Sequence, residues 1–341
     1  MNYYHNINRM KRSFTRIVFG VLMFINVPYL QAQQDPHFSQ FMFNKLNFNA
    51  GYAGATDGKI CATLLHRTQW MGFGGGTYDA GNGQTYRRGD APSNLVGSIN
   101  AALGSRIGIG ATFSNDVNGF YNTVIPRLAL SYRQPIGDGV LSAGVGVGMM
   151  QISIDGDFNA IDKDDPNIPN AKETGSALDI DAGLYYSKDN LLGVIDGFYA
   201  GFSATHLNQN KIEMTHDTKE SELHMYFVTG GSYQLNATMK LQPNVLVKKD
   251  PAKIQADLNC FLVWNENIRG GLTWRPMDAA VLLVGYEFPF GLNVGYSYDL
   301  TTSRILNYSS GSHEFMLRYC FGVKIPPREK VIRSRYTPRF M

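Results

Sequence analysis

The sequence predicts an all-β protein, a transmembrane antiparallel outer-membrane β-barrel of about 14 strands, an even number as is usual for bacterial barrels. Three observations lead to this prediction. The N-terminus has the layout of a secretory signal, most of the remaining chain alternates between apolar and polar residues, and long connections alternate with short ones.

The composition excludes several other classes of protein. Of the 341 residues, 44% are hydrophobic and 17% are charged, which argues against extensive disorder. The mean hydropathy of −0.20 is too polar for a bundle of membrane helices. The 36 glycines suit curved strands, and three cysteines are too few for a small disulfide-stapled domain.

Residues 1–32 form the predicted signal peptide. Four basic residues between Arg9 and Arg16 precede an apolar run over 17–30, and Ala32 supplies a small residue before the cleavage site. This run of about 14 residues is shorter than the ~20 that a membrane-spanning helix needs. A buried N-terminal helix is the alternative. Cleavage leaves 27 basic and 28 acidic residues, so the mature chain has no basic excess for binding nucleic acid.

The predicted barrel covers residues 59–324. In its last strand Phe315 and Tyr319 share an apolar face, whereas Glu314 and Arg318 share the polar face, because successive side chains of a strand point to opposite sides. The strands are predicted to begin near Lys59, Asn94, Ile107, Tyr121, Val140, Ala177, Gly197, Leu223, Thr238, Ile254, Ile268, Ala279, Leu292 and Ser312.

Charged residues on the polar faces distinguish a membrane barrel from a soluble β-sandwich. A sandwich also alternates, but its dry core would have to bury these charges, whereas a hydrated or salt-bridged lumen accepts them. Large aromatic residues near segment ends are typical of the girdles at a membrane interface. The predicted lumen-facing charges are Arg127, Arg133, Asp179, Asp181, Arg269, Arg275, Glu287, Asp299, Glu314 and Arg318.

The connections between strands predict an orientation. Long connections, above all 71–93, 155–176 and 207–221, join strands at one end, whereas turns such as 104–106 and 265–267 at the other end are tight. Outer-membrane barrels have long extracellular loops and short periplasmic turns. We therefore expect a bacterial outer-membrane protein with both termini on the periplasmic side.

Residues with catalytic or metal-binding chemistry form no recognisable motif, so the sequence predicts no catalytic residue, no cofactor and no metal site. The acidic loop 155–176 lacks the glycine and the glutamate that a calcium loop needs. Cys61 and Cys320 lie near the ends of the first and last strands, which meet when a barrel closes. Either a disulfide or two free thiols are compatible with that placement.

Two N-terminal stretches, 34–54 and 66–73, carry a distinctive motif. Its residues are Asp35, Pro36, Phe38, Ser39, Gln40, Asn44, Asn49, Tyr52, Gly54, Arg67, Gln69, Trp70, Gly72 and Phe73. These stretches resemble the PorP/SprF family of outer-membrane proteins, which is associated with type IX secretion and gliding motility. Phe41, Ala50 and His66 depart from the usual residues of the family, and the resemblance extends loosely over the mature chain.

The resemblance implies a non-enzymatic function. Such a protein would assist export or cell-surface anchoring of partner proteins, large adhesins with a C-terminal secretion signal, together with the type IX secretion or motility machinery. Its extracellular loops would bind this cargo, and outer-membrane lipid would surround the barrel. A passive diffusion channel is the alternative, because fourteen strands leave room for a lumen. A lipid-modifying enzyme that depends on His206 or His313 is a third hypothesis.

The two ends of the mature chain invite separate interpretations. Residues 33–58 form a predicted periplasmic N-terminal segment that either folds into the lumen as a plug or packs against the barrel rim. Gly144, Gly146 and Gly148 on one strand face allow strand curvature or leave space for such a plug. The basic tail 325–341 either contacts the secretion machinery or is a solvated terminus.

Overall fold

The structure is a computed structural model that describes residues 35–56, 58–73, 77–79, 85–87, 91–154 and 172–322. The predicted signal peptide (1–32), the basic tail (325–341) and most of the acidic loop considered for calcium (155–171) lie outside the described residues. Among the residues that are described, no helix has the length and apolar character needed to cross a membrane.

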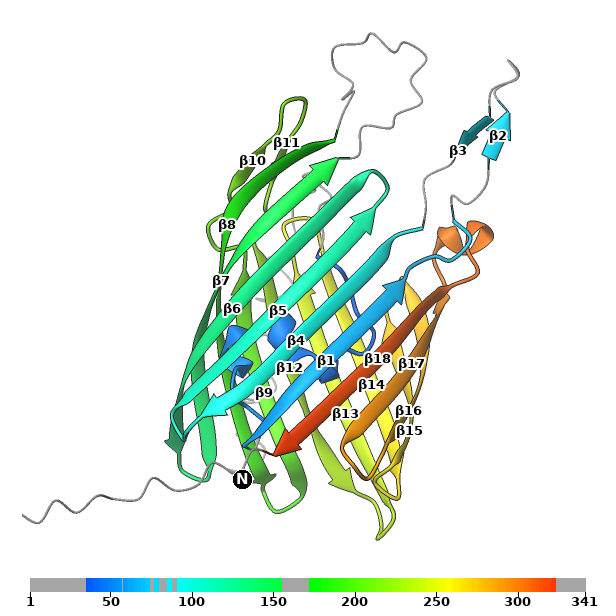
Figure 1. The fold of residues 1–341 in the computed structure, drawn as a ribbon. Helices are drawn as coiled ribbons and strands as arrows, with labels where there is room; N and C mark the ends of the chain where they lie inside the picture. The colour runs from blue at the N-terminus through cyan, green and yellow to red at the C-terminus, as the bar shows by residue number, and fades with distance from the viewer. Residues whose placement is uncertain are drawn as a thin grey trace, which may run out of the picture.

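The described residues form a closed antiparallel β-barrel of fourteen strands (Figure 1). Each strand pairs with its neighbour in sequence, and β1 pairs with β18 to close the barrel. The predicted fold class is therefore confirmed. The barrel strands are β1 (Lys59–Thr68), β4 (Ser93–Leu103), β5 (Ile107–Asn118), β6 (Tyr121–Ile136), β7 (Gly139–Ile154), β8 (Glu173–Leu191), β9 (Ile195–Thr205), β12 (His224–Gln234), β13 (Met239–Lys249), β14 (Ile254–Trp264), β15 (Ile268–Arg275), β16 (Ala279–Glu287), β17 (Leu292–Thr301) and β18 (Ser312–Gly322).

The observed strands begin within four residues of the predicted positions. The largest difference is at β8, which begins at Glu173 instead of near Ala177. At that position Glu173 pairs with Ile154 at the end of β7, so the β7–β8 ladder continues beyond the apolar alternation that marks the strand. The alternation of apolar and polar residues therefore predicts the part of a strand that has one apolar and one polar face. It misses the part at the strand end where both faces are polar.

Each strand has an outward apolar face and an inward face that is polar or small. On β6, Leu128 and Leu130 are 70% and 55% exposed, whereas Arg127 is 8% and Ser131 is 2% exposed. In a soluble protein the apolar side chains are buried and the charged ones are exposed, and here the arrangement is reversed. This reversal is what a lipid-facing barrel requires.

Connections at the two ends differ in length. The short-turn end comprises the turns after β4, β6, β8, β12, β14 and β16, and it includes residues 137–138, where Gly137 takes a left-handed φ of +58°. The long-loop end carries two hairpins, β2–β3 (Thr77–Asp79 and Thr85–Arg87) and β10–β11 (Lys211–Glu213 and Thr218–Glu220), and the 3-10 helix η4 (Arg304–Tyr308) (Figure 1). Some connections at that end are also short, such as residues 119–120 between β5 and β6.

The seam between the first and last strands is covalently joined. Cys61 lies directly opposite Cys320 in the β1–β18 register, and the two residues form a disulfide. The third cysteine, Cys260, is free and lies on the outward face of β14.

The N-terminal segment (residues 35–56) lies inside the barrel. It forms three short 3-10 helices, η1 (Phe41–Phe43), η2 (Lys45–Asn47) and η3 (Ala50–Tyr52), which appear in blue within the strands in Figure 1. Its side chains make up much of the buried apolar core of the molecule. The inward faces of the strands are therefore covered by the protein's own chain.

Candidate functional site

The N-terminal segment extends through the lumen from the long-loop end toward the short-turn end. Asp35 contacts His206 and Lys248, which lie at the long-loop ends of β9 and β13. At the other end of the segment the Gly54 N–H donates to Asn100 Oδ1 at 2.6 Å, near the short-turn end of β4. The segment therefore contacts the barrel wall along most of the length of the lumen.

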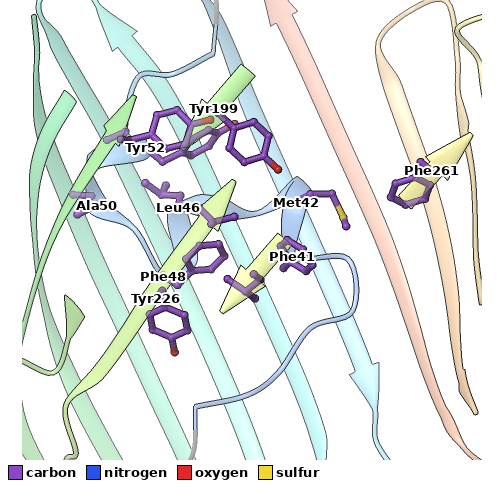
Figure 2. Packing of buried hydrophobic residues seen from close by; sticks show 14 of the residues in the cluster. Phe41, Met42, Leu46, Phe48, Ala50, Tyr52, Tyr199, Tyr226 and Phe261 are labelled. Atoms are coloured by element: carbon purple, nitrogen blue, oxygen red, sulfur yellow. The ribbon is translucent and has the colours of Figure 1, made fainter. Parts of the chain in front are cut away.

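Aromatic contacts hold the middle of the segment (Figure 2). Phe48 stacks on Tyr226 with ring centroids 5.3 Å apart, and Tyr52 packs edge-on against Tyr185 at 5.1 Å. The Lys45 ammonium lies 4.1 Å from the centroid of the Tyr199 ring. Burying one large apolar side chain stabilises the docked segment by about 1.5–3 kcal/mol relative to leaving that side chain exposed. The apolar contacts therefore hold the segment firmly in the lumen.

Glycines on the inward strand faces allow the segment's main chain to approach. A Cβ atom at Gly144 would lie 2.3 Å from the Ala50 carbonyl oxygen, and one at Gly108 would lie 2.0 Å from that of Ala53. Both distances are shorter than any stable contact, so no larger residue fits. At Gly146 and Gly148 the nearest atoms belong to the barrel itself, so these two glycines do not serve the segment.

The Ser39 cluster anchors the segment through charged hydrogen bonds. The Glu314 carboxylate accepts the N–H of Ser39 at 2.7 Å and that of Gln40 at 2.9 Å. Arg67 donates to Ser39 Oγ at 2.9 Å and to Asp299 Oδ2 at 2.8 Å. Hydrogen bonds to ionised groups are worth about twice as much as neutral ones, so this cluster fixes the position of the motif.

Arg275 extends the same network to the neighbouring strands. The residue is 1% exposed, and its guanidinium pairs with Asp257 at 3.0 Å and with Asp299 at 3.1 Å. Asp257 also accepts from His37 at 2.7 Å. Three predicted lumen charges, Arg275, Asp299 and Glu314, thus belong to one buried set with residues of the N-terminal motif.

The Asp35 cluster forms a second anchor nearer the long-loop end. The Asp35 carboxylate contacts His206 Nε2 at 2.9 Å and accepts from the Tyr226 hydroxyl at 2.7 Å. Lys248 Nζ donates to the Asp35 carbonyl at 2.8 Å. His206 Nδ1 lies 2.7 Å from Asp179. Asp35 is thus held by β12, by β13 and by the residue that follows β9.

Electrostatics keep the Asp35 cluster ionised. Arg127 lies 2.6 Å from Asp179 and 2.6 Å from Asp181. Burial alone would lower the pKa of the His206 ring, but the carboxylates of Asp35 and Asp179 outweigh burial and raise that pKa to about 10.

Other motif residues also contact the lumen wall. Phe38 is buried in an apolar group with Leu65 of β1. Asn44 accepts from Ser98 Oγ at 2.8 Å, and Asn49 donates to the Leu184 carbonyl at 3.0 Å.

The second half of the motif lies at the long-loop end. Trp70 follows β1 and packs edge-on against Phe73, with centroids 6.1 Å apart, and Gly72 between them has a left-handed φ of +86°. The Gln69 N–H donates to the Pro92 carbonyl at 2.8 Å. The motif therefore serves two regions: Asp35–Gly54 and Arg67 lie in the lumen, whereas Gln69–Phe73 lie at the rim.

The remaining predicted lumen charges also lie on the inward face. Arg269 pairs with Glu287, and its guanidinium lies 5.4 Å from the Phe43 ring centroid. Arg133 shares the inward face of β6 with Arg127 and packs beside Gly54. Arg318 lies 3.7 Å from Cys61 Sγ.

Three residues of the Asp35 cluster, Lys248, His206 and Tyr226, were absent from the predicted set of lumen-facing and motif residues. Lys248 shares the inward face of β13 with Asn244 and Leu246, so the period-two pattern contains the signal that would have found it. His206 immediately follows β9, where alternation ends, and no local pattern marks it.

A cavity of about 420 Å³ opens at the long-loop end beside the Asp35 cluster. Asp35, His206 and His224 contribute to one side, and Asp116 of β5 and Lys219 of β11 contribute to others.

Comparison with solved structures gave several barrels. The Ralstonia pickettii toluene transporter TbuX is 10% identical, with a TM-score of 0.47 over 81% of this chain and 92% of that chain. A Pseudomonas aeruginosa FadL homologue is 11% identical, with a TM-score of 0.44 over 84% and 95% of the two chains. The translocator domain of the autotransporter NalP from Neisseria meningitidis is 14% identical, with a TM-score of 0.39 over 77% and 87%. No curated protein matched.

A family model matches residues 30–319, described as type IX secretion system membrane protein PorP/SprF. The matched range includes both halves of the motif, the fourteen strands up to Tyr319 and every residue of the two lumen clusters. The resemblance stated from the motif is thereby confirmed, and the chain belongs to the PorP/SprF family of type IX secretion system membrane proteins.

Proposed function

We propose that this protein is a non-enzymatic outer-membrane barrel that assists export or cell-surface anchoring of partner proteins by the type IX secretion system. The partners are large adhesins with a C-terminal secretion signal, including those that serve gliding motility. In this proposal the short-turn end, where β18 ends, faces the periplasm and the long-loop end faces outward. Because Asp35 lies at the long-loop end, the N-terminal segment starts on the outward side and not in the periplasm, where the sequence predicts it.

The docked N-terminal segment is the observation that carries this proposal. Residues from Asp35 to Gly54 contact strands around the lumen through apolar packing and through two buried ionic clusters. A diffusion channel needs a continuous aqueous path, whereas this arrangement fills the lumen with packed side chains. The packing therefore supports a scaffold function over passive diffusion.

The long-loop end offers the surface for a protein partner. Phe73, Leu207 and Leu306 are 39%, 43% and 57% exposed on three separate connections at that end. The Met71 N–H donates to the Gly311 carbonyl at 2.7 Å, which ties the first connection to the last. Exposed apolar residues on loops held by a rigid scaffold are typical of protein-binding surfaces.

Affinity capture tests the function. The tagged protein is solubilised from outer membrane in detergent, and co-purified surface proteins are identified. The triple variant Phe73→Ser, Leu207→Ser, Leu306→Ser should lose a large secreted protein that the wild type retains. Leu192→Ser at the short-turn end, where the side chain is 87% exposed, is the control and should retain it. Equal recovery with both variants, or no partner with the wild type, would contradict the proposal.

Planar-bilayer conductance separates the scaffold from the channel. Wild type should be silent, because the segment fills the lumen. Gly144→Val should displace the segment at Ala50 and give steady conductance, whereas Gly270→Val, where a Cβ atom meets nothing within 4 Å, should stay silent. A steady open pore in the wild type would favour the diffusion channel instead.

A further inference from the structure

Three side chains with metal-binding chemistry converge at the cavity near the long-loop end. They are Asp35 from the N-terminal segment, His206 from the end of β9 and His224 from the start of β12. Their ligand atoms all lie within 4.8 Å of one another, and all three residues line the 420 Å³ cavity. No local sequence pattern unites them, since they are far apart in the chain.

His224 is a buried polar side chain without a hydrogen-bond partner in the described part of the chain. The residue is 2% exposed, and neither of its ring nitrogens has a hydrogen-bond partner among the described residues. Its Nδ1 atom lies 3.7 Å from Asp35 Oδ2, too far for a hydrogen bond. A buried polar group without a partner costs about 1–3 kcal/mol, and a bound ion at this nitrogen would remove that cost.

His206 is oriented as a metal ligand is. Its Nδ1 atom lies 2.7 Å from Asp179 Oδ1, so Nδ1–H donates to this carboxylate and Nε2 faces Asp35. Metal-binding histidines almost always use one nitrogen for the metal and donate the other N–H to a carboxylate or carbonyl. On Asp35, the Tyr226 hydroxyl donates to Oδ2 at 2.7 Å and fixes the carboxylate plane in the same way.

The spacing fits a small tetrahedral ion. With metal–ligand bonds of about 2.0–2.1 Å, two ligands of a tetrahedral site lie about 3.3 Å apart. The observed separations bracket this value, with 2.9 Å between His206 Nε2 and Asp35 Oδ1 and 3.7 Å between His224 Nδ1 and Asp35 Oδ2. The two histidines approach different oxygens of Asp35, and the three ligand atoms all lie within 4.8 Å of one another, so side-chain movements can bring them to one ion.

The surrounding charge is also suitable for a cation. Asp35, Asp116, Asp179, Asp181 and Glu222 contribute five carboxylates near the site, whereas Arg127 and Lys248 contribute two positive charges, so the acidic excess favours a cation. Lys219, which also lines the cavity, is paired with Asp217.

A second acidic group in the same region is a poorer candidate. Asp179, Asp181 and His206 are also close together, but Arg127 lies 2.6 Å from each of the two carboxylates. A guanidinium in that position repels a metal ion and already compensates both charges. Asp179 is therefore a supporting residue of the site and not a ligand.

We propose that Asp35, His206 and His224 bind a divalent transition-metal ion, with Zn²⁺ as the best chemical match, and that the fourth ligand position faces the cavity. Two imidazoles and one carboxylate form a ligand set of the type that zinc accepts, with an open position for water. The ion replaces the proton shared between His206 Nε2 and Asp35 Oδ1, and that proton goes to solvent. Because Asp35 belongs to the N-terminal segment and the histidines to the wall, the ion fastens the segment inside the barrel.

The test is metal binding by the full chain, purified from outer membrane with a tag that contains no histidine and stripped with a chelator. Zn²⁺ titration by calorimetry should give one site per chain. Co²⁺ should give the intense visible absorption of a tetrahedral site. His224→Phe keeps the ring that stacks on Tyr226 and should weaken Zn²⁺ binding at least 100-fold. Asp179→Asn should weaken it about 10- to 100-fold through the orientation of His206.

His313→Phe is the matched control, because His313 lies on β18 with Tyr296 as its partner, away from the cavity. It should bind Zn²⁺ as the wild type does. The proposal is overturned if the wild type binds no Zn²⁺, or if His224→Phe binds it as tightly as the wild type. It is equally overturned if binding survives in His224→Phe and is abolished by Asp179→Asn, because Asp179 would then be the ligand. Retention of the far-UV spectrum and heat resistance of the barrel identifies variants that have folded.

Discussion

Replacing Glu314 by glutamine tests whether the Ser39 cluster holds the N-terminal segment. The carboxylate is fully buried and accepts the N–H groups of Ser39 and Gln40, one on each oxygen. In Glu314→Gln the amide oxygen accepts one of them, and the amide NH₂ group faces the other, which becomes an unsatisfied buried donor. Arg67 also loses one of its two countercharges.

The expected magnitude follows from these contacts. An unsatisfied buried N–H costs about 1–3 kcal/mol, and replacing a charged acceptor by a neutral one costs about 1 kcal/mol more. The sum of about 3 kcal/mol corresponds to a roughly 100-fold change in the equilibrium for local opening. We therefore expect main-chain amides over residues 38–48 to lose about 100-fold of their protection from hydrogen exchange.

Hydrogen exchange followed by mass spectrometry in detergent measures this loss peptide by peptide. Peptides from β8 and β13 should keep their protection, because the strand ladders are unchanged. Glu266→Gln is the control, since Glu266 is an exposed residue at the short-turn end that pairs with Lys240 at 2.7 Å. Unchanged protection over 38–48 in Glu314→Gln, or an equal loss in the control, would refute the reasoning.

Two further predictions concern the rim and the seam. Burial raises the pKa of Asp217, but its hydrogen bonds, the first of them from the Tyr121 hydroxyl, outweigh burial and lower it. The stabilisation is therefore present above pH ~4 and is lost as the pH falls through the lowered pKa. After correction for intrinsic rates, the main-chain amides of the β10–β11 hairpin should exchange faster at pH 3 than at pH 6. Asp217→Asn should remove this pH dependence. At the seam, reduction of Cys61–Cys320 should lower the free energy of unfolding in urea by up to ~5 kcal/mol, since the bond closes a loop of 259 residues; mass spectrometry that finds both thiols free in the native protein would contradict the disulfide.

The sequence alone was sufficient to predict the barrel and to assign each strand residue to its inward or outward face. A period of two is a local property, because each side chain of a strand points to the opposite side from the one before it. Arg127, Asp179 and Glu314 could therefore be assigned to the inward face without any knowledge of their partners. Strand starts were correct to within four residues for the same reason. The motif identified the family because its residues are contiguous.

Tertiary structure alone decided what those inward residues do. Glu314 meets Ser39 across 275 residues of sequence, and Asp35 meets His206 across 171. Such contacts depend on where the N-terminal segment lies in the closed barrel, which no period or spacing encodes. The convergence of Asp35, His206 and His224 has the same origin. A barrel brings the ends of distant strands together, so a set of ligands invisible along the chain becomes one site in space.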